Sequence, residues 1–239
     1  MQKNVEKMSL NYSPNFNSKK RSKSDIKYLI FHYTGMKSES GALKKLTNKN
    51  SGVSCHYLIK NNGKVIKIVP DLYVAWHAGI SSWKKDTFLN SKSIGVEISN
   101  PGHEHGYKKY NKKQVLSIIR LAKKLKEKYK IKKENILGHS DIAPLRKKDP
   151  GEKFPWKLLY KKKICLWHNL RESSCKRLRK NKLTNSKNFY KLLFKFGYKP
   201  SNNIYEKIKI YKNFQRRFRP QLISSIVDEE SFAILKSLI

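Results

Sequence analysis

The spacing of apolar and polar positions predicts a series of short strands. Residues 26–32 form a partly alternating apolar run typical of a buried strand, and residues 93–98 form a second such run with one carboxylate inside it. Residues 54–60 and 64–69 flank the sequence Asn-Asn-Gly. Because Asn and Gly tolerate positive φ angles, these two segments are predicted to pair as a β-hairpin.

Helical spacing appears in between. Residues 111–129 carry the i, i+3, i+4, i+7 stripe of an amphipathic helix that should pack on a sheet, with apolar side chains at Val115, Ile118, Ile119, Ala122 and Leu125. Residues 38–46 predict a shorter helix with Ser38 or Ser40 near its N-cap. Residues 135–137 read as a last short strand, and the Gly and Pro residues after it predict a loop rather than a helix. Strands interleaved with helices indicate an α/β layer structure.

Changes in composition divide the chain into four parts. Residues 1–24 form a polar arm that is expected to wrap or fray, and residues 25–162 hold the α/β domain. Residues 163–186 are basic and polar, which favours a linker containing a turn or two of helix. Residues 187–239 show helical spacing in three places and predict a small all-α bundle. About fifty residues are marginal for independent stability, so this bundle is expected to dock on the first domain.

The net charge favours anionic binding partners but does not choose among them. Lys+Arg number 54 and Asp+Glu number 17, which gives a net charge of +37. Such a potential attracts polyanions, among them nucleic acid, anionic lipid headgroups and acidic cell-wall polymers. Lysine greatly outnumbers arginine, as composition drift alone would produce, and no recognisable nucleic-acid module is present. A basic nucleic-acid-binding protein therefore stays as an alternative, and no specific nucleic-acid partner is expected.

The cysteines and the apolar runs of the sequence are relevant to the cellular compartment of the protein. The three cysteines contain no CxxC pair, so neither a disulfide framework nor a cysteine zinc site is indicated, and a single Cys165–Cys175 bridge stays open. No apolar run approaches the roughly 20 residues of a membrane span. Residues 1–25 lack the apolar region of a secretory signal, which weakens an envelope assignment.

The densest chemistry lies between residues 138 and 151. His139 and Asp149 are ten positions apart in a turn-rich context and can converge on one cation if the intervening loop folds back. Catalytic zinc usually takes three protein ligands and leaves a fourth position for water. His32, at the end of the apolar run 26–32, can supply the third ligand. The sequence therefore predicts a hydrolytic site with one Zn²⁺ per chain.

Six motifs follow one another in order between about residues 20 and 160: Phe31-His32-Tyr33-Thr34, Cys55-His56-Tyr57-Leu58-Ile59, Ala75-Trp76-His77-Ala78-Gly79, Ser93-Ile94-Gly95-Val96-Glu97, Gly138-His139-Ser140-Asp141-Ile142-Ala143-Pro144 and Lys147-Lys148-Asp149-Pro150-Gly151. This ordered set resembles the type 2 N-acetylmuramoyl-L-alanine amidases, in particular their AmpD/AmiD-like branch. The resemblance implies a mixed central β-sheet flanked by helices. It also implies zinc-dependent hydrolysis of the amide between N-acetylmuramic acid and L-alanine in peptidoglycan or muropeptides.

The resemblance also implies roles for single residues. His32, His139 and Asp149 fall on the family's zinc ligands. Glu97 falls on its catalytic acid/base, and Lys147 falls on its oxyanion-stabilising lysine. These roles agree with elementary chemistry, because a carboxylate can take and return a proton and an ammonium group can meet developing negative charge.

The other histidines are assigned from their neighbours in sequence. Trp76 and His77 are candidates for lining the sugar and peptide groove, and a structural loop role is an equal alternative for them. His56 is expected in the core or behind the ligands. His103 and His105 resemble a metal pair, but their flanking glycines favour an exposed loop.

The C-terminal bundle, residues 187–239, is similar to the small helical peptidoglycan-binding module of such amidases, and a helical cap over apolar surface is the alternative. The predicted function is a zinc amidase of cell-wall turnover or recycling. A non-catalytic peptidoglycan recognition protein is the rival within the same fold. The substrate implies the periplasm or cell envelope, whereas the missing signal leaves a cytoplasmic enzyme open. The oligomeric state cannot be read.

Overall fold

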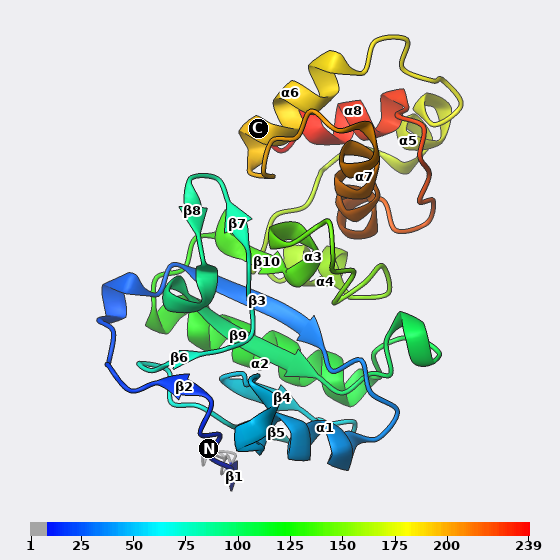
Figure 1. The fold of residues 1–239 in the computed structure, drawn as a ribbon. Helices are drawn as coiled ribbons and strands as arrows, with labels where there is room; N and C mark the ends of the chain where they lie inside the picture. The colour runs from blue at the N-terminus through cyan, green and yellow to red at the C-terminus, as the bar shows by residue number, and fades with distance from the viewer. Residues whose placement is uncertain (1–8) are drawn as a thin grey trace.

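The centre of the protein is a six-stranded sheet in a computed structural model that describes residues 9–239 (Figure 1). Its strand order is β1-β5-β4-β9-β3-β10, with β4 and β5 antiparallel and the other neighbours parallel. The sheet is therefore mixed, as expected. The strands are β1 (Ser9–Leu10), β2 (Phe16–Asn17), β3 (Tyr28–Tyr33), β4 (Tyr57–Ile59), β5 (Val65–Lys67), β6 (Val74–Ala75), β7 (Ser82–Trp83), β8 (Asp86–Thr87), β9 (Ser93–Ile98) and β10 (Ile136–Gly138).

Helices cover the sheet and form the C-terminal part of the chain. Figure 1 shows α2 running along one face of the central strands, whereas α1 lies beside β4 and β5. Both begin where a polar side chain caps them, since Ser38 Oγ accepts from Gly41 N and Asn111 Oδ1 accepts from Gln114 N. The helices are α1 (Glu39–Thr47), α2 (Lys112–Lys128), α3 (His139–Ile142), α4 (Trp156–Lys161), α5 (Glu172–Leu178), α6 (Lys187–Phe196), α7 (Ile204–Phe218) and α8 (Glu229–Lys236).

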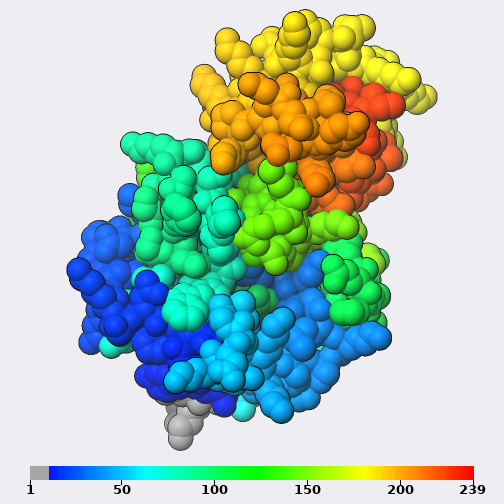
Figure 2. All heavy atoms as spheres, viewed as in Figure 1, coloured from blue at the N-terminus to red at the C-terminus, as the bar shows by residue number. Residues whose placement is uncertain are grey.

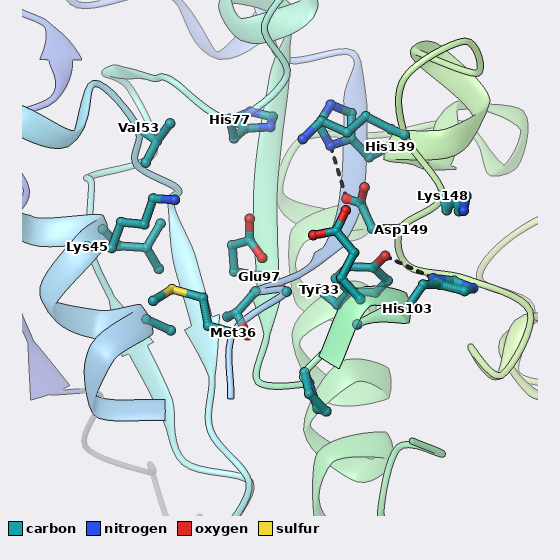
Figure 3. A pocket seen from close by; sticks show the side chains of 18 of the residues that line it. Tyr33, Met36, Lys45, Val53, His77, Glu97, His103, His139, Lys148 and Asp149 are labelled. Carbon is teal, nitrogen blue, oxygen red and sulfur yellow. Dashed lines mark hydrogen bonds and ion pairs between the residues drawn. The ribbon is translucent and has the colours of Figure 1, made fainter. Parts of the chain in front are cut away.

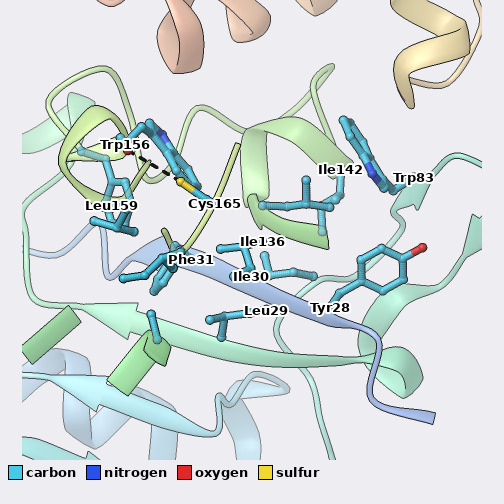
Figure 4. Packing of buried hydrophobic residues seen from close by; sticks show 14 of the residues in the cluster. Tyr28, Leu29, Ile30, Phe31, Trp83, Ile136, Ile142, Trp156, Leu159 and Cys165 are labelled. Carbon is cyan, nitrogen blue, oxygen red and sulfur yellow. Dashed lines mark hydrogen bonds between the residues drawn. The ribbon is translucent and has the colours of Figure 1, made fainter. Parts of the chain in front are cut away.

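Alternation along β4 separates two hydrophobic clusters. Tyr57 and Ile59 belong to the main core, whereas Leu58 belongs to a smaller cluster that includes Leu46 of α1. The main core continues past β3, where the ring of Phe31 lies 5.0 Å from that of Phe154, close to Trp156 and Leu159 (Figure 4). The α/β layer expected from the sequence is confirmed.

The parallel strands β10, β3 and β9 place their carboxyl ends at one edge of the sheet. In the β3–β9 register His32 lies opposite Glu97, and in the β10–β3 register Gly138 lies opposite Phe31. His139 therefore leaves the sheet next to His32. This edge therefore brings together the side chains of His32, Glu97 and His139, which are far apart in the sequence.

The described part of the polar arm, residues 9–24, wraps around the α/β layer. β1 adds to the sheet beside β5, and β2 pairs with β6. The buried guanidinium of Arg21 donates to the backbone oxygens of Asp71, Asn90 and Ser91. The rest of the arm, residues 1–8, lies outside the described residues.

The C-terminal helices α6, α7 and α8 pack against the α/β layer and share its hydrophobic core. In the space-filling view the orange segment of α7 lies directly against the yellow-green segment that follows β10 (Figure 2). The ring of Trp83 lies 5.1 Å from that of Tyr198. α5 forms within the basic segment, and its Cys175 is buried. Cys165 and Cys175 are both free thiols, so the bridge left open by the sequence is not formed.

One predicted loop is wrong in part. Residues 139–142 form the one-turn helix α3, because the carboxylate of Asp141 accepts from the Gly138 backbone N–H and caps its start. The turn ends at Ala143, the residue before Pro144, as the restriction on the residue preceding a proline requires. Among residues 9–239 no helix is long and apolar enough to cross a membrane.

Candidate metal centre and catalytic cleft

Three buried side chains converge at the carboxyl edge of the sheet. The Nδ1 atoms of His32 and His139 lie 2.9 Å apart, and Asp149 Oδ2 lies 3.2 Å and 3.0 Å from them, respectively. All three residues are buried, and one ligand atom from each lies within 4.8 Å of the others. Figure 3 shows His139 and Asp149 facing each other across the cleft wall. The structure therefore brings together the three ligands expected from the sequence.

A chain of hydrogen bonds fixes the tautomer of His32. Ser93 Oγ lies 2.6 Å from the Leu89 carbonyl oxygen and must donate its proton there, so it accepts from His77 Nε2–H at 3.2 Å. His77 Nδ1 is then an acceptor, and His32 Nε2–H donates to it over 3.0 Å. The Nδ1 lone pair of His32 is thereby left facing Asp149.

His139 is oriented in the same way by the backbone. Its Nε2 lies 3.1 Å from the carbonyl oxygen of Ala78, which can only accept, so the proton sits on Nε2 and the Nδ1 lone pair is free. Two imidazole lone pairs and a carboxylate oxygen then share one small volume. Without a cation between them these donors repel one another. The donor set fits a borderline divalent metal such as zinc.

Electrostatics at the cluster favour the same protonation states. Burial, aided by the charge of His139, lowers the pKa of His32 to about 4. Burial by itself raises the pKa of Asp149, but in the metal-free protein the positive charge and the hydrogen bond that His139 supplies when its Nδ1 also carries a proton outweigh burial and hold that pKa well below the usual range. At neutral pH His32 is therefore a neutral imidazole beside an ionised carboxylate, which are the forms that bind metal.

The segment that carries Asp149 is anchored on both sides. The Ser140 N–H donates to the Asp149 carbonyl oxygen over 2.8 Å. The next carbonyl, that of Pro150, accepts from the hydroxyls of Tyr107 and Tyr110 at 2.7 and 2.8 Å. The loop from β10 therefore folds back as the sequence required, and the two tyrosines hold its far end.

Glu97 extends into the cleft from β9, a central strand. Its Oε2 atom is buried and has no hydrogen-bond partner among the described residues. Burial and then the negative charge of Asp149 raise the pKa of Glu97 to about 8, although the charge of Lys147 opposes the shift. A carboxylate with a free oxygen and a proton affinity near neutrality is suited to moving a proton.

The two adjacent lysines of the loop differ in exposure. Lys147 is half-buried, and its charge acts on both Glu97 and His32, whereas Lys148 is exposed. Both lysines line the cleft, and Lys147 is the one whose charge acts on Glu97 and His32. On the opposite wall, Lys45 of α1 also lines the cleft (Figure 3).

These side chains line a cavity of about 410 Å³ between α1, the end of β9 and the loop that carries Lys147. Trp76 and His77 both lie in its wall. The indole of Trp76 is partly exposed and donates its Nε1–H to Asn17 Oδ1 at 2.7 Å. Both nitrogens of His77 are already engaged by His32 and Ser93.

Comparison with known proteins now identifies the family. A family model described as N-acetylmuramoyl-L-alanine amidase matches residues 22–152, which is more than half of the chain. The chain belongs to the N-acetylmuramoyl-L-alanine amidase family. This amidase is also 36% identical to the N-acetylmuramoyl-L-alanine amidase AmiD of Escherichia coli (strain K12) over 230 residues, which cover 90% of this chain and 82% of AmiD.

Solved structures extend the similarity to the C-terminal helices. AmiD from E. coli, in complex with anhydro-N-acetylmuramic acid-L-Ala-D-gamma-Glu-L-Lys, has a TM-score of 0.80 at 33% identity and covers 93% of this chain and 91% of its own. AmpDh3 from Pseudomonas aeruginosa, in complex with an anhydromuramic pentapeptide, has a TM-score of 0.80 at 27% identity and covers 99% and 96%. The resemblance, the fold class and the amidase class expected from the sequence are confirmed.

The interpretation of His103 and His105 as parts of an exposed loop is correct for only one of the two histidines. His103 is half-buried rather than exposed, because its ring contacts the Tyr33 hydroxyl and the Glu152 carboxylate and stacks on Tyr107. His105 is exposed and does not join it in a cluster of possible ligands within residues 9–239. His56 is fully buried, and its Nδ1 accepts from the Gly95 N–H, so the expected core position is confirmed.

Proposed function

We propose that the protein is a zinc-dependent amidase that hydrolyses the amide bond between N-acetylmuramic acid and L-alanine. His32, His139 and Asp149 hold the zinc ion, Glu97 transfers the proton, and Lys147 stabilises the negative charge that develops on the carbonyl oxygen. The observation that carries the proposal is the position of Glu97. Its buried oxygen, which has no hydrogen-bond partner within residues 9–239, lies at the same sheet edge as the cluster of three donors, in a cleft of about 410 Å³.

Bound zinc supplies Lewis acidity that lowers the pKa of a water molecule and polarises a carbonyl group. The protein's contribution is to present three donors in fixed orientation. Ser93, His77 and the Ala78 carbonyl settle which nitrogen of each histidine is free, and Asp149 adds one negative charge. Such partners behind the ligands raise affinity because no side chain has to reorient on binding.

Glu97 accounts for the proton balance of hydrolysis. It takes one proton from the attacking water as the new C–O bond forms at the lactyl carbonyl carbon. When the C–N bond breaks, it returns that proton to the nitrogen of L-alanine, so that a carboxylate and an amine leave. In the metal-free protein burial raises the pKa of Glu97 to about 8, and the positive charge of bound zinc would lower it, so that the carboxylate is free to accept the proton near neutral pH.

Lys147 lies where negative charge would develop. Its ammonium group is close enough to influence the pKa of both Glu97 and His32, so it faces the reacting region from the loop side. A positioned donor to the tetrahedral oxyanion typically lowers the barrier by about 3 kcal/mol. We therefore assign Lys147, rather than the exposed Lys148, to this role.

Anhydro-muropeptides are the proposed substrate class, and intact peptidoglycan is the extension to test. The two solved relatives are described in complex with anhydromuramic peptides. This chain has a cleft of about 410 Å³ that is lined by Glu97, His139 and Asp149. The partly exposed Trp76 offers an indole face for the muramic ring at the cleft rim. A role in cell-wall turnover or recycling follows from that substrate, and the periplasm or cell envelope is the proposed compartment.

Product analysis tests this proposal. The zinc-loaded protein is incubated with a purified anhydro-muropeptide in H₂¹⁸O, with and without a chelator, and the products are identified by mass spectrometry. The expected result is free stem peptide and ¹⁸O in the lactyl carboxylate, lost on chelation and restored by zinc. A muropeptide that binds but stays intact would instead support a non-catalytic recognition protein.

A further inference from the structure

The loop that carries Lys147 and Asp149, the proposed oxyanion-stabilising residue and one proposed metal ligand, is hydrogen-bonded by α7 of the C-terminal unit. Lys147 and Asp149 lie on the loop between α3 and α4, and Figure 1 shows α7 of the C-terminal unit beside this region. The buried side chain of Asn213, in the middle of α7, donates from Nδ2 to the backbone oxygens of Pro144 and Lys147, over 2.7 and 3.0 Å. Both amide protons of Asn213 thus bind the loop.

The orientation of the Asn213 amide is determined by its partners. Pro144 and Lys147 present carbonyl oxygens, which can only accept, so the NH₂ group must face the loop. The Oδ1 atom faces the other way and accepts from Arg216 Nη1 over 2.9 Å. Since the Asn213 side chain is buried and each of its polar atoms is paired, the amide has one stable arrangement, and the loop backbone is fixed with it.

A second contact from the same helix holds the start of the loop. Arg217, four residues after Asn213, lies on the same face of α7 and bonds both the Asp141 carboxylate and the Ile136 carbonyl oxygen. The other oxygen of Asp141 accepts from the Tyr198 hydroxyl, also from the C-terminal unit. The segment between β10 and Asp149 is therefore clamped at two points by residues outside the amidase layer.

We propose that Asn213 is a positioning residue for the loop that carries Lys147 and Asp149, so that the C-terminal helical unit forms part of the active site. Its two hydrogen bonds hold the turn from Pro144 to Lys147, and this turn sets the direction of the Lys147 side chain. The same turn leads, two residues later, to Asp149. This inference rests on the proposed roles of Lys147 and Asp149, although Asn213 itself touches neither substrate nor metal.

The variant Asn213→Ala removes both hydrogen bonds, and Asn203→Ala is its matched control. Asn203 caps the exposed start of the same helix, where its Oδ1 accepts from Tyr205 N and Glu206 N, and it makes no described contact with the loop. Asn203→Ala therefore weakens α7 without releasing the turn. Asn213→Ser, which keeps one donor, is the milder second variant in case Asn213→Ala does not fold.

Three measurements separate positioning from simple destabilisation. In Asn213→Ala, the backbone amides of Arg146 and Lys147, which both bond the Ala143 carbonyl in the native turn, should exchange with deuterium faster in the zinc-free protein. Zinc affinity, measured by competition with a chromogenic chelator, should fall about tenfold. For the muropeptide, kcat should fall about tenfold or more with little change in KM, since binding contacts remain.

The outcomes are distinct. The proposal is supported if Asn213→Ala, or to a lesser degree Asn213→Ser, shows these changes while Asn203→Ala does not, even at a similar loss of melting temperature. It is overturned if the Asn213 variants keep native amide protection and zinc affinity, or if Asn203→Ala reproduces their losses. A wild-type protein without amidase activity would refute the proposed function, whereas amide exchange and zinc affinity would still decide the role of Asn213.

Discussion

His32 Nε2 lies 3.0 Å from His77 Nδ1, and this contact determines which nitrogen of His32 faces the proposed metal position. The chain continues from His77 to Ser93 and ends at the Leu89 carbonyl oxygen. The Ser93 hydroxyl, which is two hydrogen bonds away from His32, therefore determines which nitrogen of His32 carries the proton. His77 therefore supports the proposed metal ligands and also forms part of the cleft wall.

Replacing Ser93 tests this chain. In Ser93→Ala the His77 ring loses the acceptor that fixes its Nε2 proton, so His32 can bind with the wrong tautomer. Zinc affinity should fall about tenfold, as is usual for loss of a group behind a ligand. Ser91→Ala is the control, because Ser91 is exposed and lies two positions earlier. Equal zinc affinities in the two variants would contradict the role of the chain.

Glu97 should make the metal-free protein less stable at alkaline pH. Its folded-state pKa is raised from 4.5 to about 8, so the folded protein binds this proton more tightly than the unfolded chain does. The penalty is absent below about pH 4.5, grows as the pH rises, and is complete above about pH 8. Glu97→Gln removes it, and the variant should be more stable than wild type at pH 9 by up to about 5 kcal/mol.

Urea unfolding of chelator-treated protein at pH 5 and pH 9 measures this difference. Glu104→Gln, at an exposed carboxylate in the same cleft wall, serves as the control and should show no gain at pH 9. A Glu97→Gln protein that is no more stable than wild type at pH 9 would show that burial and the charge of Asp149 do not destabilise the ionised Glu97 carboxylate.

Asp71 should contribute to stability at neutral pH and lose that contribution in acid. Burial alone raises its pKa, but hydrogen bonds from Lys128, Tyr129 and Tyr57 outweigh burial and lower the pKa below the usual 3.8. The stabilisation is therefore present above about pH 4 and fades as the pH falls through the lowered value. Asp71→Asn should cost about 3 kcal/mol at pH 7 because it leaves a buried network incomplete.

Denaturant titrations of wild type and Asp71→Asn between pH 7 and pH 2 check this expectation. The two stability curves should approach each other as the pH is lowered. Curves that stay parallel throughout would mean that the Asp71 carboxylate is not the source of the difference.

Gly197 should be required for docking of the helical unit. Its φ angle of +155° is one that side chains rarely adopt, and a Cβ there would lie 2.6 Å from Trp83 Cε2. Gly197→Ala should lower stability by about 2 kcal/mol and change the near-ultraviolet signal of Trp83. Gly106→Ala, at φ +84° with no atom within 4 Å of its Cβ, controls for backbone strain alone. An equal loss in both variants would argue against the contact with Trp83.

Long periodic segments were predictable from the sequence. Residues 93–98 form β9, and the stripe in 111–129 forms α2, because many side chains in each repeat the same preference. The two-residue strands β7 and β8 carry too short a pattern to be recognised. The predicted loop at residues 139–142 contains α3 because one carboxylate, Asp141, caps the turn, which composition does not reveal.

Some residues of the candidate site were likewise predictable from the sequence, and others were not. His32, His139 and Asp149 could be proposed because their spacing and the family motifs mark them, and the structure brings them together. Ser93 and Asn213 could not be, since each acts through hydrogen bonds to groups distant in sequence or to the backbone. Ordinary polar residues of this kind acquire a role only once the tertiary fold has placed their partners.

The rate of stem-peptide release by zinc-loaded Glu97→Gln, compared with wild type at equal bound zinc, is the measurement to make first. Gln matches Glu in shape and cannot move the proton, so kcat should fall by a factor on the order of 10² or more, while muropeptide binding and zinc content stay the same. A Glu97→Gln protein that releases stem peptide at the wild-type rate would contradict the proposed mechanism.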